Sequence, residues 1–163
     1  MPSARFLGDS SFGFSLYSGE PDKKITATFY PYDWIEASLF YVNSAGIGSG
    51  AGTSKNFRDD GLNLKLRLKE EGVYPAIAIG FNDLAGTGLY SSEYIVASYG
   101  IDNIDFLFGA GWGSMNGEAI SKNPFSYVHD SFLDRPVLNE GQGSQFELDR
   151  YFSDTSVSFF GGI

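Results

Sequence analysis

One stretch of strictly alternating residues, Leu62–Lys69, restricts the folds open to this chain more than any other feature. Every even position in it is Leu, and the odd positions are the polar residues Asn63, Lys65, Arg67 and Lys69. Successive side chains of a β-strand point to opposite faces, so the four Leu share one face and the polar residues share the other. The stretch therefore predicts a strand that lies between an apolar and a polar environment.

The two-residue period recurs along the chain, while the helical period is nearly absent. The 21 Gly and the 17% share of aromatic residues also favour a β-rich protein with tight turns. From the second connection onward, short and long connections alternate, as tight periplasmic turns and longer external loops do in a transmembrane barrel. We therefore predict an all-β fold, an antiparallel up-and-down transmembrane β-barrel of about eight strands. It forms a single domain over residues 1–163 with a long external loop at about 113–154. The expected strands are Ser11–Ser18, Lys24–Tyr30, Trp34–Val42, Leu62–Lys69, Tyr74–Asn82, Glu93–Gly100, Ile104–Trp112 and Thr155–Gly162.

The polar face of these strands supplies candidate residues for the barrel interior. They are Glu36, Asn63, Lys65 and Arg67. The interior of a barrel is polar by default, and Glu36 could neutralise one of the cations. The functional alternative is that the cations contact an acidic polysaccharide in transit. Both interpretations stay open at this point.

Amphipathic aromatic residues gather near the expected strand ends. A barrel that spans a bilayer carries a girdle of such rings at each interface. The alternative is that the rings pack the core of a soluble β-protein. The candidates are Tyr30, Trp34, Tyr74 and Tyr99 beside the short turns, with Tyr41 and Trp112 toward the opposite ends.

Composition excludes several classes of function. The net charge of −9, with no basic cluster longer than Asp22-Lys23-Lys24, argues against nucleic acid as a partner. The absence of Cys excludes disulfides, thiol catalysis and Cys-based zinc sites. The single His129 has no His, Cys or spaced carboxylate set around it. We therefore predict a protein that is not an enzyme and that holds no cofactor or metal.

Acidic residues gather in the long connection, but their spacing does not match a dense calcium loop. A solvated acidic loop is the simpler interpretation. The alternative is that divalent cations bridge the loop to lipopolysaccharide phosphates.

Several ordered motifs resemble one known family. The opening Met1–Arg5, then Tyr30–Ala37, Phe57–Leu68 and Gly86–Ser98, followed by Gly109–Gly113, are similar to the first part of the YjbH family. These are outer-membrane proteins encoded with exopolysaccharide and group 4 capsule genes. The resemblance covers Met1 to about Gly113 and is thin over 114–154.

The resemblance implies an outer membrane of a Gram-negative bacterium as the location. It implies outer-membrane lipid and lipopolysaccharide as surroundings, with exopolysaccharide and other export proteins as partners. Family members are several times longer and begin with a secretion signal, which this chain lacks, so we expect a segment of a larger barrel. The expected function is non-enzymatic assistance in exopolysaccharide or capsule secretion or assembly. The alternatives are a soluble β-sandwich that binds carbohydrate and a generic porin-like barrel.

Overall fold

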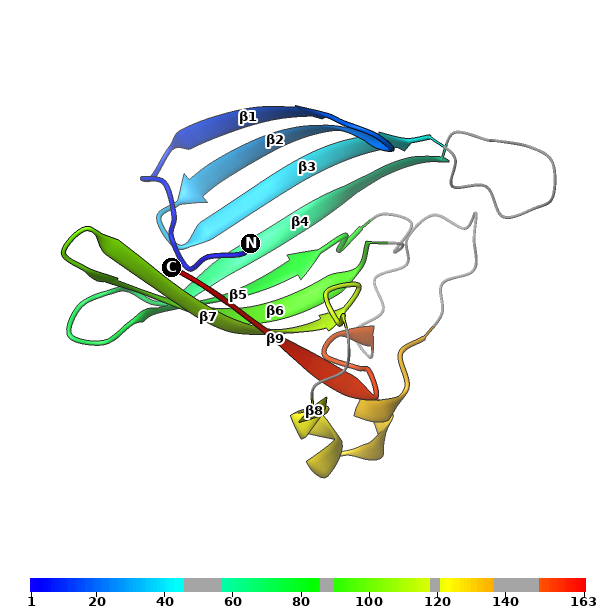
Figure 1. Cartoon of the computed structure of the whole chain (residues 1–163). Helices are drawn as coiled ribbons and strands as arrows, with labels where there is room; N and C mark the ends of the chain where they lie inside the picture. The colour runs from blue at the N-terminus through cyan, green and yellow to red at the C-terminus, as the bar shows by residue number, and fades with distance from the viewer. Residues whose placement is uncertain (46–56, 86–89, 118–120, 137–149) are drawn as a thin grey trace.

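The computed structural model describes residues 1–45, 57–85, 90–117, 121–136 and 150–163, and in them the chain forms one antiparallel sheet (Figure 1). The sheet has nine strands in the order β1-β2-β3-β4-β5-β6-β7-β9-β8. Two short 3₁₀ turns, η1 and η2, stand beside it. The elements are β1 (Ser11–Ser18), β2 (Asp22–Tyr32), β3 (Ile35–Ser44), β4 (Phe57–Lys69), β5 (Ala76–Asn82), β6 (Ser92–Ile101), β7 (Ile104–Gly113), β8 (Ser121–Lys122), η1 (Pro124–Tyr127), η2 (Asp130–Leu133) and β9 (Ser156–Gly162).

The expected all-β antiparallel arrangement is confirmed. Each of the eight predicted strands has a counterpart whose ends differ by a few residues, and β1 agrees at both ends. The two-residue β8 was not expected. In the described part of the chain, β1 and β8 are the edges of an open sheet, so the sheet is not closed into a barrel. No helix there is long and apolar enough to cross a membrane.

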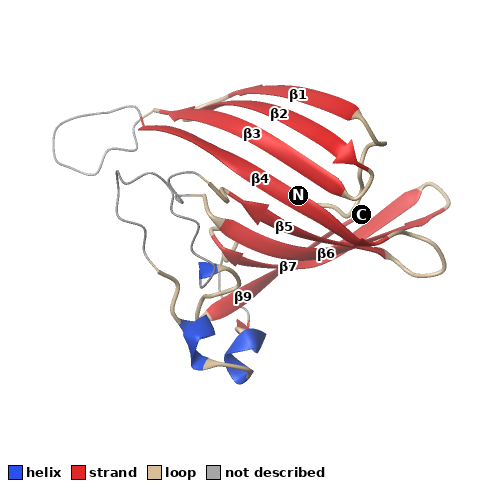
Figure 2. Ribbon diagram, turned by 180° about the vertical axis from the view of Figure 1, so that it is seen from behind, coloured by secondary structure: helices blue, strands red, loops and turns tan. Residues whose placement is uncertain are grey.

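The sheet curls so strongly that it has an inner and an outer face. The N-terminal segment, Met1–Leu7, lies inside the curve in both views (Figures 1 and 2). The strand register places Glu36 directly opposite Lys65 on the inner face, and Leu39 directly opposite Leu62 on the outer face. The Leu/polar alternation of β4 therefore separates the two faces as the sequence predicted.

Three pairs of a glycine and an aromatic residue shape the inner face. In each pair the two residues are direct partners on neighbouring strands: Phe40 and Gly61, Gly80 and Tyr94, Gly109 and Phe160. The ring lies over its glycine so closely that a Cβ at Gly80 would meet the Tyr94 ring at 2.1 Å. Glycine is therefore required at these positions because the ring occupies the space that a side chain would take.

Connections of different length leave the two ends of the sheet. The short turns 33–34, 70–75 and 102–103 leave one end, which we call the short-turn end. The connections 45–56, 83–91 and 114–155 leave the opposite, long-loop end, together with the short turn 19–21 between β1 and β2. The segments 46–56, 86–89, 118–120 and 137–149 lie outside the described residues, so the predicted external loops are described only in part.

Candidate functional site

An ion pair lies on the inner face where β3 and β4 meet. The Lys65 Nζ is 2.6 Å from the Glu36 Oε2, and both side chains are largely buried. The same ammonium donates a hydrogen bond to the Arg5 carbonyl oxygen at 2.9 Å. A buried ion pair is tolerated when further hydrogen bonds satisfy its charges, and the N-terminal segment supplies one here. The expectation that Glu36 neutralises a cation therefore agrees with the observed contact.

The N-terminal segment is attached to the sheet at two points. The Ala4 amide donates to the Ser98 Oγ at 2.9 Å, and the Ala4 side chain joins a buried cluster with Ala78 and Val96. The Arg5 guanidinium forms ion pairs with Glu71 in the β4–β5 turn and with Asp105 at the start of β7. The segment thereby connects two short turns across the inner face.

Two hollows remain beside the N-terminal segment. One, of about 390 Å³, is lined by Tyr30, Glu36, Lys65 and Tyr94 together with the segment itself. The other, of about 490 Å³, lies toward the short-turn end beside Arg67. Volumes of this order are those of small-molecule pockets. Their walls combine aromatic rings with charged groups.

The four predicted interior residues all lie on the inner face, but only two of them meet. Glu36 and Lys65 are ion-paired. The Arg67 guanidinium lies 4.7 Å from the centre of the Phe6 ring and 3.5 Å from the Glu70 carboxylate. The Asn63 Oδ1 accepts a hydrogen bond from the Asp83 amide at 3.0 Å. The basic side chains thus have partners within the protein, and any acidic ligand must compete with them.

The six predicted girdle residues divide into two groups. Trp34, Tyr41 and Tyr74 are exposed, and Tyr99 is half-buried on the outer face. Trp34 stacks on Tyr32 at the short-turn end, with ring centroids 5.9 Å apart. The structure differs from the expectation at the other two residues. Tyr30 points to the inner face because it lies two residues after Thr28, which contacts Ser38 there, and Trp112 is covered by Phe125 and Phe152.

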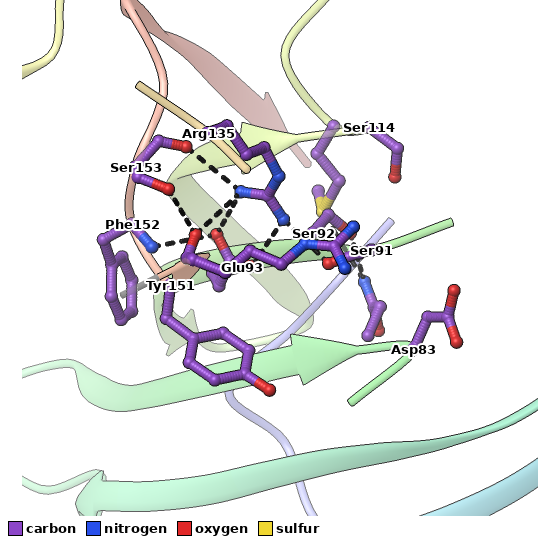
Figure 3. Close-up of polar contacts among 12 residues, drawn as sticks. Asp83, Ser91, Ser92, Glu93, Ser114, Arg135, Tyr151, Phe152 and Ser153 are labelled. Atoms are coloured by element: carbon purple, nitrogen blue, oxygen red, sulfur yellow. Dashed lines mark hydrogen bonds and ion pairs between the residues drawn. The ribbon is translucent and has the colours of Figure 1, made fainter. Parts of the chain in front are cut away.

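A second cluster lies on the outer face at the long-loop end, where Glu93 and Arg135 meet (Figure 3) beside the residues that cover Trp112. The Trp112 ring packs against Phe125 and Phe152 at 5.6 and 5.1 Å, and its Nε1 donates to the Asn123 Oδ1. Beside it, the fully buried Glu93 accepts two hydrogen bonds, of 2.8 and 2.9 Å, from the Arg135 guanidinium. This bidentate pair attaches the long connection to β6.

Sequence reasoning missed Glu93, Arg135 and Asn123. The Asn123 Nδ2 lies within hydrogen-bond distance of three carbonyl oxygens, those of Phe132, Phe152 and Asp154. The sequence did contain one signal for Glu93. It occupies one of the alternate positions of β6 that otherwise carry apolar residues, so a carboxylate there must be buried with a partner. Its partner is 42 residues away in sequence, and no local pattern identifies it.

The described residues contain no group of three or more His, Cys, Asp or Glu side chains that could hold a metal ion. His129 caps η2 through its Nδ1, which accepts from the Ser131 amide at 3.1 Å. This contact gives His129 a structural role at the start of η2.

Comparisons with known proteins extend the motif resemblance to the whole chain. The family described as "Exopolysaccharide biosynthesis protein YbjH" matches residues 1–163. The chain belongs to the YjbH family. A member from Escherichia coli (strain K12), named "Uncharacterized lipoprotein YjbH", is 28% identical over 168 residues. The match covers 99% of this chain but only 24% of that relative, so the chain spans about a quarter of its length. No solved structure matches.

Proposed function

We propose that this YjbH-family chain forms part of the wall of an outer-membrane β-barrel that assists the secretion or assembly of an exopolysaccharide. The family's name connects it with exopolysaccharide biosynthesis. The role in secretion, the absence of enzymatic chemistry and the outer-membrane location are the parts that we propose.

The observation that carries this proposal is the outer face. Large apolar side chains are exposed there on the first three strands of the sheet, β1, β2 and β3, and on β7 and β9 toward its other edge. They are Phe12, Phe14, Leu16, Ile25, Phe29, Leu39, Phe106, Phe108 and Phe159. Water-soluble proteins rarely expose so continuous an apolar surface, whereas a barrel wall in lipid requires one.

The inner face supports the same proposal because its character is opposite. It combines the ion pair Glu36–Lys65 with hydroxyl groups such as the Thr28–Ser38 pair, whose oxygens are 3.1 Å apart. An apolar outside and a polar inside are the pattern of a membrane barrel. A soluble β-sandwich buries its apolar faces between two sheets, and the residues described here form one main sheet with its apolar face uncovered on most strands.

The inner face also favours a particular kind of contact with a polymer. Three cations of the inner face, Arg5, Lys65 and Arg67, each have a carboxylate partner, so these three do not form an open basic surface. Tyr30 and Tyr94 line the hollow beside them. Sugar contacts through aromatic rings and hydroxyl groups fit this wall better than capture of an acidic polymer by charge.

The role is tested by deleting the gene in its native host and measuring exopolysaccharide in the medium. We expect export to fall and to recover when the gene is restored. As a matched comparison, the gene is restored with the substitutions Lys65→Met and Glu36→Gln. This variant should still form the barrel. Its export should differ from that of the wild type only if the inner face contacts the polymer. Unchanged export after deletion would remove the polysaccharide role and leave a porin-like barrel as the alternative.

A further inference from the structure

Three oxygen-bearing side chains lie on the inner face of three successive strands near the long-loop end. They are Asp22 on β2, Ser44 on β3 and Asp59 on β4. Asp22 is the direct partner of Ser44, and Asp59 is the partner of Val42, two residues before Ser44. Direct cross-strand neighbours have Cβ atoms about 5 Å apart and diagonal neighbours about 7 Å, so Ser44 lies between the two carboxylates.

These oxygens are buried without hydrogen-bond partners. Asp59 is 1% exposed and Ser44 is 0% exposed. Within the described part of the chain, both carboxylate oxygens of Asp59, the Oδ1 of Asp22 and the Oγ of Ser44 accept and donate no hydrogen bond. Burial of an ionised carboxylate without a compensating charge is strongly unfavourable. The arrangement therefore calls for a positive charge at this place.

Among the residues that the structure describes, no side chain forms an ion pair that supplies that charge to Asp59. Lys24 lies on the same face, but its ammonium lies over the Phe40 ring, 4.9 Å from the centroid. Lys24 is thus the side chain that could neutralise Asp59 in place of a bound cation, and an experiment must distinguish the two.

Tyr90, in the β5–β6 connection, lies within the electrostatic influence of these carboxylates. Burial raises the pKa of its hydroxyl, and the charges of Asp22, Asp59 and Asp83 raise it further. Asp83 accepts a hydrogen bond from the Tyr90 amide at 3.2 Å. The negative charges of three carboxylates thus reach the Tyr90 hydroxyl near the long-loop end.

We propose that Asp22, Ser44 and Asp59 bind a divalent cation of the calcium class. Ca²⁺ accepts carboxylate, hydroxyl and water oxygens in flexible geometry, whereas Mg²⁺ demands a near-ideal octahedron. Two carboxylates and one hydroxyl leave several positions for water, so we expect weak binding, with a Kd on the order of 10⁻⁴–10⁻³ M. The cation neutralises Asp59 and ties β2, β3 and β4 together.

Calcium titration of the purified full chain in detergent tests this proposal. We expect heat of binding in the wild type and a higher unfolding temperature with Ca²⁺ than with a chelator. Asp59→Asn should weaken binding at least tenfold and remove the calcium-induced stabilisation. The matched control is Asp60→Asn, because Asp60 is the next residue, is exposed and lies on the outer face. It should bind Ca²⁺ like the wild type.

The chelated state separates a cation site from an internal ion pair. Without Ca²⁺, Asp59→Asn should be at least as stable as the wild type, because the substitution removes an uncompensated charge. Loss of stability in the chelated variant would show that a side chain such as Lys24 already neutralises Asp59, and it would overturn the proposal.

A second variant covers the case in which Asp59→Asn does not fold. Ser44→Ala should fold and bind Ca²⁺ severalfold more weakly. Absence of calcium binding by the wild type, or unchanged affinity in Ser44→Ala, would also overturn the proposal. The measurement needs no polysaccharide export, so its result is independent of the proposed function.

Discussion

At the scale of single residues, Gly80 and Tyr94 show how the inner face is filled. The Tyr94 ring occupies the place of a Gly80 side chain, and the same exchange occurs between Phe40 and Gly61. The rings thereby pack against the backbone of the neighbouring strand instead of projecting into the space inside the curve. The ion pair Glu36–Lys65 follows the same principle for charge, since each side chain is matched by its direct cross-strand partner.

This packing predicts that two strand glycines respond differently to one added methyl group. Gly80→Ala should destabilise the protein by about 1–3 kcal/mol, because the new Cβ must displace the Tyr94 ring. Gly13→Ala, also in a strand, should be neutral or slightly stabilising, since its Cβ would meet Thr28 at an ordinary 3.8 Å. Urea unfolding in detergent measures both. Equal costs at the two positions would contradict the assigned packing.

At the scale of elements, the sheet carries two attached segments with different anchors. The N-terminal segment is attached on the inner face through Ala4 and Arg5. The long connection is attached on the outer face through Arg135 and Asn123. In both cases a few long-range polar contacts hold a segment that has little regular structure of its own.

The strands were predictable from sequence and the attached segments were not. Period-2 alternation, as in Leu62–Lys69, fixes both the strand and its faces, and turn residues fix the neighbours in an antiparallel meander. The cover over Trp112 depends on contacts such as Glu93–Arg135, which join residues far apart in sequence. The alternation of side chains along each strand predicted that Glu36 and Lys65 share one face. The contact of Lys65 with Arg5 could not be predicted, because it depends on the path of the N-terminal segment.

For the long connection, we predict that Glu93 and Arg135 depend on each other. Glu93→Leu alone should cost about 3–5 kcal/mol, because it leaves the Arg135 guanidinium buried without its carboxylate. Adding Arg135→Met should recover part of this loss. The double variant should therefore lose less free energy of unfolding than the two single variants lose together. A double-mutant cycle by urea unfolding measures the coupling. Additive effects would show that the pair is not a structural unit.

For the N-terminal segment, we predict that Arg5 keeps it inside the curve. Arg5→Gln removes the ion pairs with Glu71 and Asp105, so chymotrypsin should cleave next to Phe6 faster than in the wild type. Lys23→Gln is the control, because it also removes a cation but from an exposed position on β2. Equal cleavage rates in all three proteins would show that the ion pairs of Arg5 do not hold the segment.

At the scale of the whole molecule, the main support for a membrane barrel is the apolar outer face, which would be unfavourable in water. The outer face exposes Phe12, Phe14 and Leu16 on β1 and stacks Phe108 on Phe159 across β7 and β9. Exposed aromatic residues such as Trp34 and Tyr74 lie at the short-turn end, where a membrane interface would be. The edges β1 and β8 leave backbone groups unpaired in the described sheet, and lipid cannot satisfy them. Further pairing at these edges is therefore required of a membrane-inserted form.

The two faces should respond oppositely to a new charge. Phe14→Lys places an ammonium in the middle of the outer face and should cost about 2–4 kcal/mol in a bilayer. Ser15→Lys, the next residue on the inner face, should cost far less. Unfolding from lipid vesicles measures both variants. If Phe14→Lys instead leaves stability unchanged and improves solubility in water, the outer face is a soluble surface.

The most direct test of the central claim is fractionation of cells that express the natural gene, with membrane extracts run on a denaturing gel before and after heating. We predict that the protein stays in the outer-membrane fraction, needs detergent for extraction and changes its mobility on heating. A protein that remains in solution without detergent and shows one mobility would contradict the membrane barrel.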